Sequence, residues 1–172
     1  MKRGVKNQYI DCGNYYEIIL EDRYGNERYR TKISKDELEK VRPHKWHYEA
    51  VYNTKYGGYA KTTAKIGLTW KQRKTLTIGD IILGKKQGCT VDHINHDPLD
   101  NRNENLRFAT KRQQVMNRRV RGYFWNTRLQ KWFATIKLHD KQIYLGVFTN
   151  EKDAKNARLK AQRELFGIFS SV

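Results

Sequence analysis

Residues 91–110 read VDHINHDPLDNRNENLRFAT, and this motif segment concentrates carboxylates, side-chain amides and imidazoles. The residues leading into it predict a strand over Cys89–Asn95, and the Asn- and Asp-rich stretch that follows predicts a polar loop over Asn95–Glu104. A second short strand is expected over Asn105–Ala109. A capping-box pattern then predicts a helix over about 110–119. The segment therefore predicts two short strands followed by a helix.

The residue types of the motif segment suit phosphodiester hydrolysis, which needs an activated water and a cation near the leaving oxygen. A histidine can act as the base near neutral pH. In a strand, Asp92 and His93 point to opposite sides, so one could hold a metal while the other faces the water. Asn105, returning on the second strand, could contact the His93 ring and fix its tautomer. Gln114 and Asn117 share a helix face, and either could complete the metal site.

The motif segment, with D-H, L-D-N-R and N-L-R at this spacing, resembles the motif of the HNH (ββα-metal) nucleases of phages and mobile elements, notably their homing endonucleases. The resemblance covers about residues 75–118. It implies that His93 is the general base, that Asp92 is a metal ligand and that Asn105 orients His93. It also implies one divalent cation, Mg²⁺ or Mn²⁺, in each active site.

Two positions depart from the family pattern. The second metal ligand is usually Asn or His on the helix, but this chain has Gln114 there and Asn117 one turn later. Relatives often carry a His-Arg pair before the motif, where this chain has Gly79 and Asp80. The alternative to an active nuclease is therefore a sequence-specific DNA-binding regulator with a degenerate, inactive HNH site.

The net charge of +17 on 172 residues predicts a polyanionic partner. No acidic residue occurs between Glu49 and Asp80, or between Glu104 and Asp140. The basic residues there alternate with aromatic and β-branched residues and form no basic amphipathic helix, which favours nucleic acid over a membrane. An RNA-binding protein is disfavoured because no aromatic RNP motif is present. Double-stranded DNA is the expected partner.

The cysteine content and the apolar runs exclude several classes of protein. Cys12 and Cys89 are the only cysteines and form no CxxC pair, which argues against a disulfide framework and a structural zinc site. The first residues lack the apolar core of a signal peptide, and no run is long enough to span a membrane. The expected location is the cytoplasm of a bacterial or phage-infected host cell.

The C-terminal part predicts three strands, over Gly122–Asn126, Lys131–Leu138 and Gln142–Val147, and then a helix from Thr149 or Asn150 to Gly167. On the second strand, apolar and polar residues alternate, so one face is expected to pack on the helix. The helix would contribute a stripe at helical spacing formed by Ala154, Ala157, Ala161 and Leu165. The other sheet face, with Phe133, Thr135 and Lys137 on the second strand, would be basic, aromatic and polar.

Residues 121–168 resemble the Apetala-two (ethylene-response-factor) DNA-binding domain. The matching pieces are Arg121-Gly122, Lys131-Trp132, Ala134, Ile136-Lys137, Tyr144-Leu145-Gly146 and the Ala-rich helix. The resemblance, together with the basic run before it, implies that a sheet contacts DNA through Arg118, Arg119, Arg121, Arg128, Thr135, Lys137, Gln142 and Tyr144.

The N-terminal part predicts a β-hairpin from Tyr15–Leu20 and Arg28–Ile33, then a short helix capped by Ser34 with Glu37, and then short strands between Trp46 and Leu83. The expected fold class is α+β, in three parts. These are a β-rich, DNA-contacting region (1–74), a ββα-metal HNH core (75–119) and a three-stranded antiparallel sheet packed on one helix (120–172). The protein would be a monomer or a homodimer. One centre cuts one strand, so a double break would need a dimer or two events.

Overall fold

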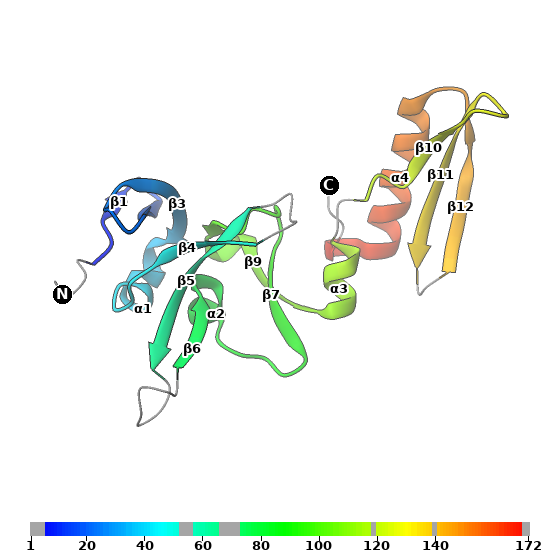
Figure 1. Ribbon diagram of the computed structural model, residues 1–172. Helices are drawn as coiled ribbons and strands as arrows, with labels where there is room; N and C mark the ends of the chain where they lie inside the picture. Colours follow the sequence, from blue (N-terminus) through cyan, green and yellow to red (C-terminus); the bar gives the residue numbers. More distant parts are fainter. Residues whose placement is uncertain (1–5, 52–56, 66–72, 118–119, 139–140, 170–172) are drawn as a thin grey trace. The chain divides into compact units, whose positions relative to one another are not determined.

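The computed structural model describes residues 6–51, 57–65, 73–117, 120–138 and 141–169, which combine several small sheets and a few helices in an α+β fold (Figure 1). Contacts divide the chain into two units, Met1–Lys111 and Arg112–Val172. The division into three domains, with limits at residues 74 and 119, stays a prediction. Within the described ranges, no helix is both long and apolar enough to cross a membrane.

The first sheet of unit 1 has the strand order β1-β2-β3-β8. Its strands are β1 (Tyr9–Asp11), β2 (Tyr15–Glu21), β3 (Glu27–Ser34) and β8 (Asp100–Asn101). β2 and β3 pair antiparallel, which confirms the predicted hairpin. β8, in contrast, comes from the motif segment and pairs parallel with β3. The loop of the motif segment is therefore part of the N-terminal sheet.

The helical turn after β3 begins differently from the prediction. It consists of a 3₁₀ turn (Lys35–Glu37) and α1 (Leu38–Val41), but the Ser34 side chain makes no capping hydrogen bond. Its Oγ instead accepts a hydrogen bond from the backbone N–H of Asn103 at 2.8 Å. The predicted capping box was wrong, because a distant donor from the motif segment binds the hydroxyl.

The second sheet has the order β4-β5-β6 and leads into a helix that the sequence did not predict. The strands are β4 (His47–Ala50), β5 (Gly58–Lys65) and β6 (Arg73–Thr77), followed by α2 (Ile78–Leu83). Strands were expected up to Leu83. A capping box between Thr77 and Asp80 begins α2 instead, and the helix buries Ile78 and Ile82.

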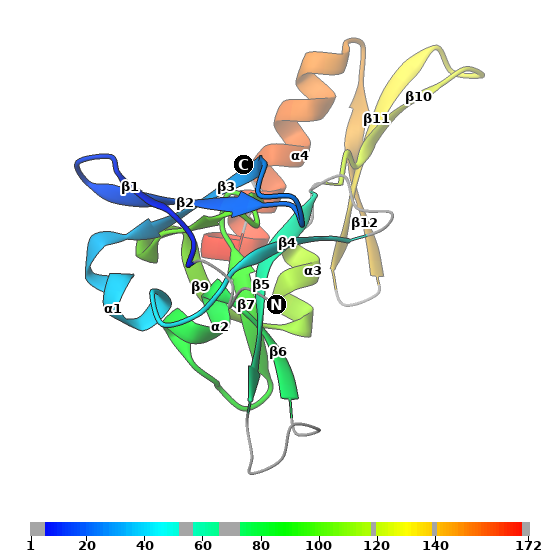
Figure 2. The same ribbon diagram turned by 60° about the vertical axis from the view of Figure 1, so that its left-hand side comes forward.

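The motif segment forms a two-stranded sheet of β7 (Cys89–His93) and β9 (Leu106–Thr110), joined by a loop that contains β8 and a 3₁₀ turn (Asn103–Asn105). α3 (Lys111–Met116) follows. Helix α2 lies against both strands of this hairpin (Figure 2). A Cβ atom at position 79 would lie 2.7 Å from Val91 Cγ1, so the close approach of helix and strand requires Gly79.

One hydrophobic core joins these elements of unit 1. Its most buried members come from both sheets, from α1 and α2 and from the hairpin: Ile18, Leu20, Ile33, Val41, Trp46, Ala60, Ile78, Ile82 and Leu106. Burying such side chains stabilises a fold by about 1.5–3 kcal/mol each. The hairpin with Asp92 and His93 thus depends on the N-terminal sheets for its support.

Unit 2 is a three-stranded antiparallel sheet, β10-β11-β12, packed on α4, as the sequence predicts. Its elements are β10 (Tyr123–Asn126), β11 (Lys131–Leu138), β12 (Lys141–Phe148), α4 (Glu151–Phe166) and a final 3₁₀ turn (Gly167–Phe169). Asn150 caps α4 by accepting a hydrogen bond from the backbone N–H of Asp153.

The buried face of α4 differs from the predicted alanine stripe. Ala154 and Ala161 are buried, but Leu165 is 40% exposed. Arg158 and Gln162 are buried in its place, and Arg158 Nη1 donates a hydrogen bond to Gln162 Oε1 at 2.8 Å. The prediction weighed only apolar residues, whereas this internal hydrogen bond offsets part of the cost of burying two polar side chains.

We predict that Asn7→Ala lowers the free energy of unfolding by about 1–3 kcal/mol, because it leaves buried backbone groups without partners. Asn7 Nδ2 donates to the carbonyls of Ile19 (2.8 Å) and Trp46 (2.9 Å), and its Oδ1 accepts from Trp46 N–H (2.7 Å). Urea unfolding followed by circular dichroism measures the change. The exposed Asn14→Ala is the matched control. Equal stability of the two variants would contradict this account.

Candidate active site

The β7–β9 hairpin sets the directions of Asp92 and His93. Asp92 lies opposite Arg107 and His93 lies opposite Leu106 in the antiparallel register. Directly opposed residues share a face of a sheet, and successive residues alternate between faces. Asp92 and Arg107 are therefore on one face, while His93 and the core residue Leu106 are on the other.

Asp92 forms an ion pair with Arg107 across the two strands. Arg107 Nε donates to Asp92 Oδ2 at 2.8 Å, and each side chain is only 12% exposed. A charge-assisted hydrogen bond in such a sheltered place holds the carboxylate in a defined orientation. Arg107 was not singled out from the sequence, although the antiparallel register of the two predicted strands could have pointed to it.

His93 contacts the side-chain amide of Asn101. The distance from His93 Nε2 to Asn101 Oδ1 is 3.2 Å. The amide orientation follows from its other bonds, because Asn101 Nδ2 donates to Thr31 Oγ1 at 3.0 Å and to the carbonyl of Pro98 at 3.4 Å. The Thr31 hydroxyl in turn donates to the Leu99 carbonyl at 2.8 Å, so it must accept from Asn101.

These directions fix the tautomer of His93. Since Asn101 Oδ1 can only accept, Nε2 must carry the proton. In the neutral ring, Nδ1 is then the nitrogen with the lone pair. The chain of bonds Leu99–Thr31–Asn101–His93, called here the hydrogen-bond relay, runs from β3 through β8 to β7. A strand of the N-terminal sheet thereby determines which nitrogen of His93 can accept a proton.

The surroundings of His93 favour its neutral form. Burial lowers the pKa of His93 below its ordinary value, because the charged ring would lose solvation. The hydrogen bond with Asn101 and the nearby carboxylates, first among them Asp92, only partly offset this lowering of the pKa. The ring of Tyr59 lies 6.1 Å from the His93 ring, centroid to centroid. At neutral pH, His93 can therefore act as a base.

Asn105 has a different place from the one that the sequence suggested. Its Nδ2 donates to the Asp100 carbonyl at 2.7 Å, and its Oδ1 accepts from the backbone N–H of Asn95 at 2.9 Å. The amide thus closes the loop between β7 and β8. The expectation that Asn105 contacts the His93 ring was therefore wrong. The Asn105 amide is occupied by backbone groups, and Asn101 contacts His93 Nε2 instead. The part of Asn105 in catalysis stays a prediction.

The loop that Asn105 closes is further held by Asp100. Arg102 Nε and Nη2 donate to the two Asp100 oxygens at 2.7 and 2.8 Å, and Asn95 Nδ2 donates at 3.0 Å. Burial raises the pKa of Asp100, but the hydrogen bonds and charge of Arg102 outweigh it and lower the pKa. Asp100 is therefore ionised at neutral pH, and it stabilises the loop that carries Asn101.

The expected helix ligands belong to the second unit. Gln114 lies on α3 and is half-buried, and Asn117 directly follows the helix and is buried. Asp92 and His93 belong to the first unit, so the combination of these residues into a metal site stays a prediction. Arg118 and Arg119 lie outside the described residues. Among the described residues, no cluster of three His, Cys, Asp or Glu side chains could hold a metal.

The sheet of unit 2 gathers four of the expected DNA-contacting residues on the face opposite α4. Thr135 pairs with Tyr144, and Lys137 pairs with Gln142. Phe124 and Phe133 stack on the same face, with ring centroids 5.8 Å apart. Phe133 was expected on this face together with Thr135 and Lys137, and the face was predicted to be aromatic as well as basic and polar.

Of the four arginines expected to contact DNA, the two that the structure describes lie apart from that group. Arg128 is exposed in the turn between β10 and β11. Arg121 is on the side of the sheet that faces α4, where its Nη2 pairs with Glu151 at 2.7 Å and its guanidinium covers the Tyr123 ring at 4.7 Å. Thr135, Lys137, Gln142 and Tyr144 are therefore the residues that the structure brings together.

A comparison with protein families matches residues 85–116 to the HNH endonucleases. The matched part contains β7, the loop with Asn101 and Asn105, β9 and α3. Neither the search of curated proteins nor the search of solved structures gave a match. The match covers less than half of the chain and supports an HNH nuclease, an enzyme class that acts on DNA.

Proposed function

We propose that this protein is a metal-dependent endonuclease of the homing type that hydrolyses phosphodiester bonds in duplex DNA. The observation that carries the proposal is the pair Asp92–His93 within the matched segment, with His93 held neutral and its Nε2 bound to Asn101. A neutral imidazole with one fixed tautomer is suited to accept a proton from water. The adjacent carboxylate is suited to hold a hard cation.

In the proposed reaction, His93 Nδ1 accepts a proton from a water molecule as the water oxygen attacks phosphorus. A bond forms between this oxygen and phosphorus, and the bond from phosphorus to the 3′-oxygen breaks. Solvent supplies the proton for the leaving oxygen. The hydrogen bond from Nε2–H to Asn101 Oδ1 strengthens as the ring becomes positive. The relay thus fixes the tautomer of the neutral ring and stabilises the protonated ring.

Asp92 and Gln114, or Asn117 in place of Gln114, would hold a Mg²⁺ or Mn²⁺ ion. These residues offer a carboxylate and an amide oxygen, and Mg²⁺ favours such oxygen ligands together with several waters. When bound, the ion would supply positive charge against the charge that develops on phosphorus and on the leaving oxygen. Arg107 orients the Asp92 carboxylate through Oδ2.

The sheet of unit 2 would position the duplex in the manner of an Apetala-two domain. The exposed face of a small sheet can enter the major groove, where Lys and Gln side chains reach phosphates and base edges. One centre of this kind cuts one strand. A monomer would therefore nick DNA, and a double-strand break would need two subunits or two events.

We predict that His93→Ala lowers the rate of plasmid nicking by about 10²–10⁴-fold, because the general base is lost. Binding of duplex DNA in a gel-shift assay stays unchanged. Conversion of supercoiled to open-circular plasmid measures the rate, and EDTA should abolish it until Mg²⁺ or Mn²⁺ is added in excess. The exposed His47→Ala serves as the matched control and keeps the wild-type rate. Wild-type nicking by purified His93→Ala would overturn the assignment.

We predict that Lys137→Ala weakens duplex binding and lowers the slope of log K against log salt by about 0.9, the amount expected for one phosphate contact. Fluorescence anisotropy at several salt concentrations measures both quantities. Lys155→Ala removes an equal charge from the exposed side of α4 and should leave them unchanged. If both variants have the same effect, the sheet face does not contact DNA.

A further inference from the structure

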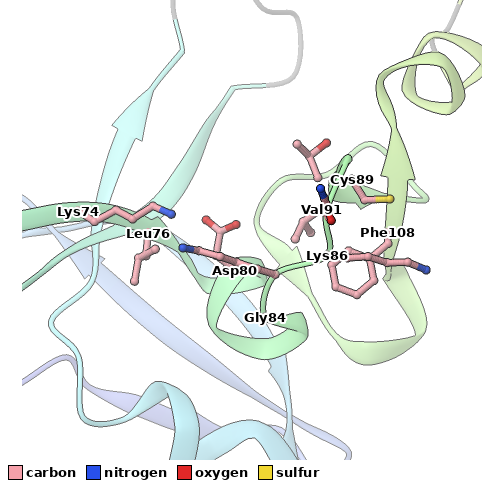
Figure 3. Close-up of a pocket in the computed structure, with 11 residues that line it drawn as sticks. Lys74, Leu76, Asp80, Gly84, Lys86, Cys89, Val91 and Phe108 are labelled. Carbon is pink, nitrogen blue, oxygen red and sulfur yellow. The ribbon is translucent and has the colours of Figure 1, made fainter. Parts of the chain in front are cut away.

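A basic cavity of about 350 Å³ lies in unit 1 beside the motif hairpin. It lies between β6, the segment after α2 and the beginning of β7 (Figure 3). Three lysines from two different segments contribute to its wall, Lys74 from β6 and Lys85 and Lys86 from the segment after α2. This group is called here the lysine cavity. Gln87 and Thr90 add polar groups, while Val91 and Phe108 form an apolar part of the wall.

The ammonium groups of Lys74 and Lys85 lie close enough to affect each other. The pKa of Lys74 is lowered chiefly by its contact with Lys85 and by the charge of that residue. The two ammonium groups carry the same charge and repel each other. An anion bound between them would offset this repulsion. Lys86 Nζ lies 5.8 Å from the centre of the Phe108 ring, which holds a third cation at the cavity.

One carboxylate, that of Asp80, also lines the cavity. Its Oδ2 accepts hydrogen bonds from the backbone N–H of Thr77 at 2.9 Å and from the Thr77 hydroxyl at 2.8 Å. This carboxylate therefore serves to begin α2. The lining residues contribute three positive charges against this one negative charge, so the cavity keeps a net positive charge and suits an anion.

The position of the cavity indicates which anion it would bind. Val91, in its wall, precedes His93 by two residues on β7 and points to the same face. Two residues of a strand span about 7 Å. A DNA strand presents one phosphate for about every 3.4 Å of helix axis. A phosphate about one or two nucleotides from the bond at His93 would therefore reach the lysine cavity.

We infer that the lysine cavity binds a backbone phosphate of the DNA strand that is cut, beside the cleaved bond. This inference rests on the proposed function, because it takes DNA as the substrate. The cavity fixes the register of the strand relative to His93 without reading its sequence, as phosphate contacts do.

Two measurements on the full chain test this inference. In the first, duplex DNA is added without metal to the His93→Ala variant, and the lysines are labelled with an amine-reactive reagent and quantified by mass spectrometry. Lys74, Lys85 and Lys86 should lose most of their labelling, whereas Lys40 and Lys45, which pair with Glu37 and Glu21, should keep theirs. This measurement needs no substitution in the cavity.

In the second measurement, Lys74→Ala/Lys85→Ala should weaken duplex binding at least tenfold and reduce the salt slope by about 0.9. Lys40→Ala/Lys45→Ala, with the same loss of charge, should leave both near wild type, and Lys74→Arg/Lys85→Arg should largely restore binding. Equal labelling with and without DNA, or equal binding by the two alanine variants, would overturn the inference. Protection of the cavity without any nicking by the wild-type chain would support phosphate binding in the lysine cavity, but it would reject the nuclease function and with it the placement beside a cleaved bond.

Discussion

The hydrogen bond between Asn101 and His93 depends on the parallel pairing of β3 with β8, and the rest of the site follows from that pairing. Lys32 and Ile33 of β3 pair with Asp100 and Asn101 of β8. This pairing brings the Thr31 hydroxyl to the Asn101 amide and thereby fixes the oxygen that faces His93. A buried polar chain of this kind is stable only when each donor has its acceptor.

The N-terminal region therefore has a structural part in the site, whether or not it also contacts DNA. Its residues, including Val41 of α1 and Trp46, provide most of the core under the hairpin, and β3 provides Thr31 of the relay. Ser34 also holds the loop through the backbone of Asn103. Loss of the N-terminal sheet would remove both the support of β7 and the constraint on the His93 tautomer.

The sequence predicted the features that depend on neighbours along the chain. Alternating residues predicted the strands of unit 2, and the spacing around Asp92 and His93 predicted the hairpin. Contacts between distant segments could not be predicted in this way. The donor that binds Ser34 is 69 residues away. Asn105 was expected beside His93 where the structure has Asn101, because the sequence does not show which of the two amides reaches the ring. α2 was missed because a short capped helix resembles a short apolar strand.

The protonation state and tautomer of His93 are measured most directly by ¹⁵N NMR of its imidazole ring. A pH titration of ¹⁵N-histidine-labelled protein gives both the pKa and the tautomer, with Asn101→Ala as the comparison. We expect the pKa of His93 to lie below the ordinary 6.5, with Nε2 protonated and Nδ1 unprotonated in the neutral ring. In Asn101→Ala, loss of the hydrogen bond should allow both tautomers. A proton on Nδ1 in the wild-type protein, or a pKa above 6.5, would contradict the account.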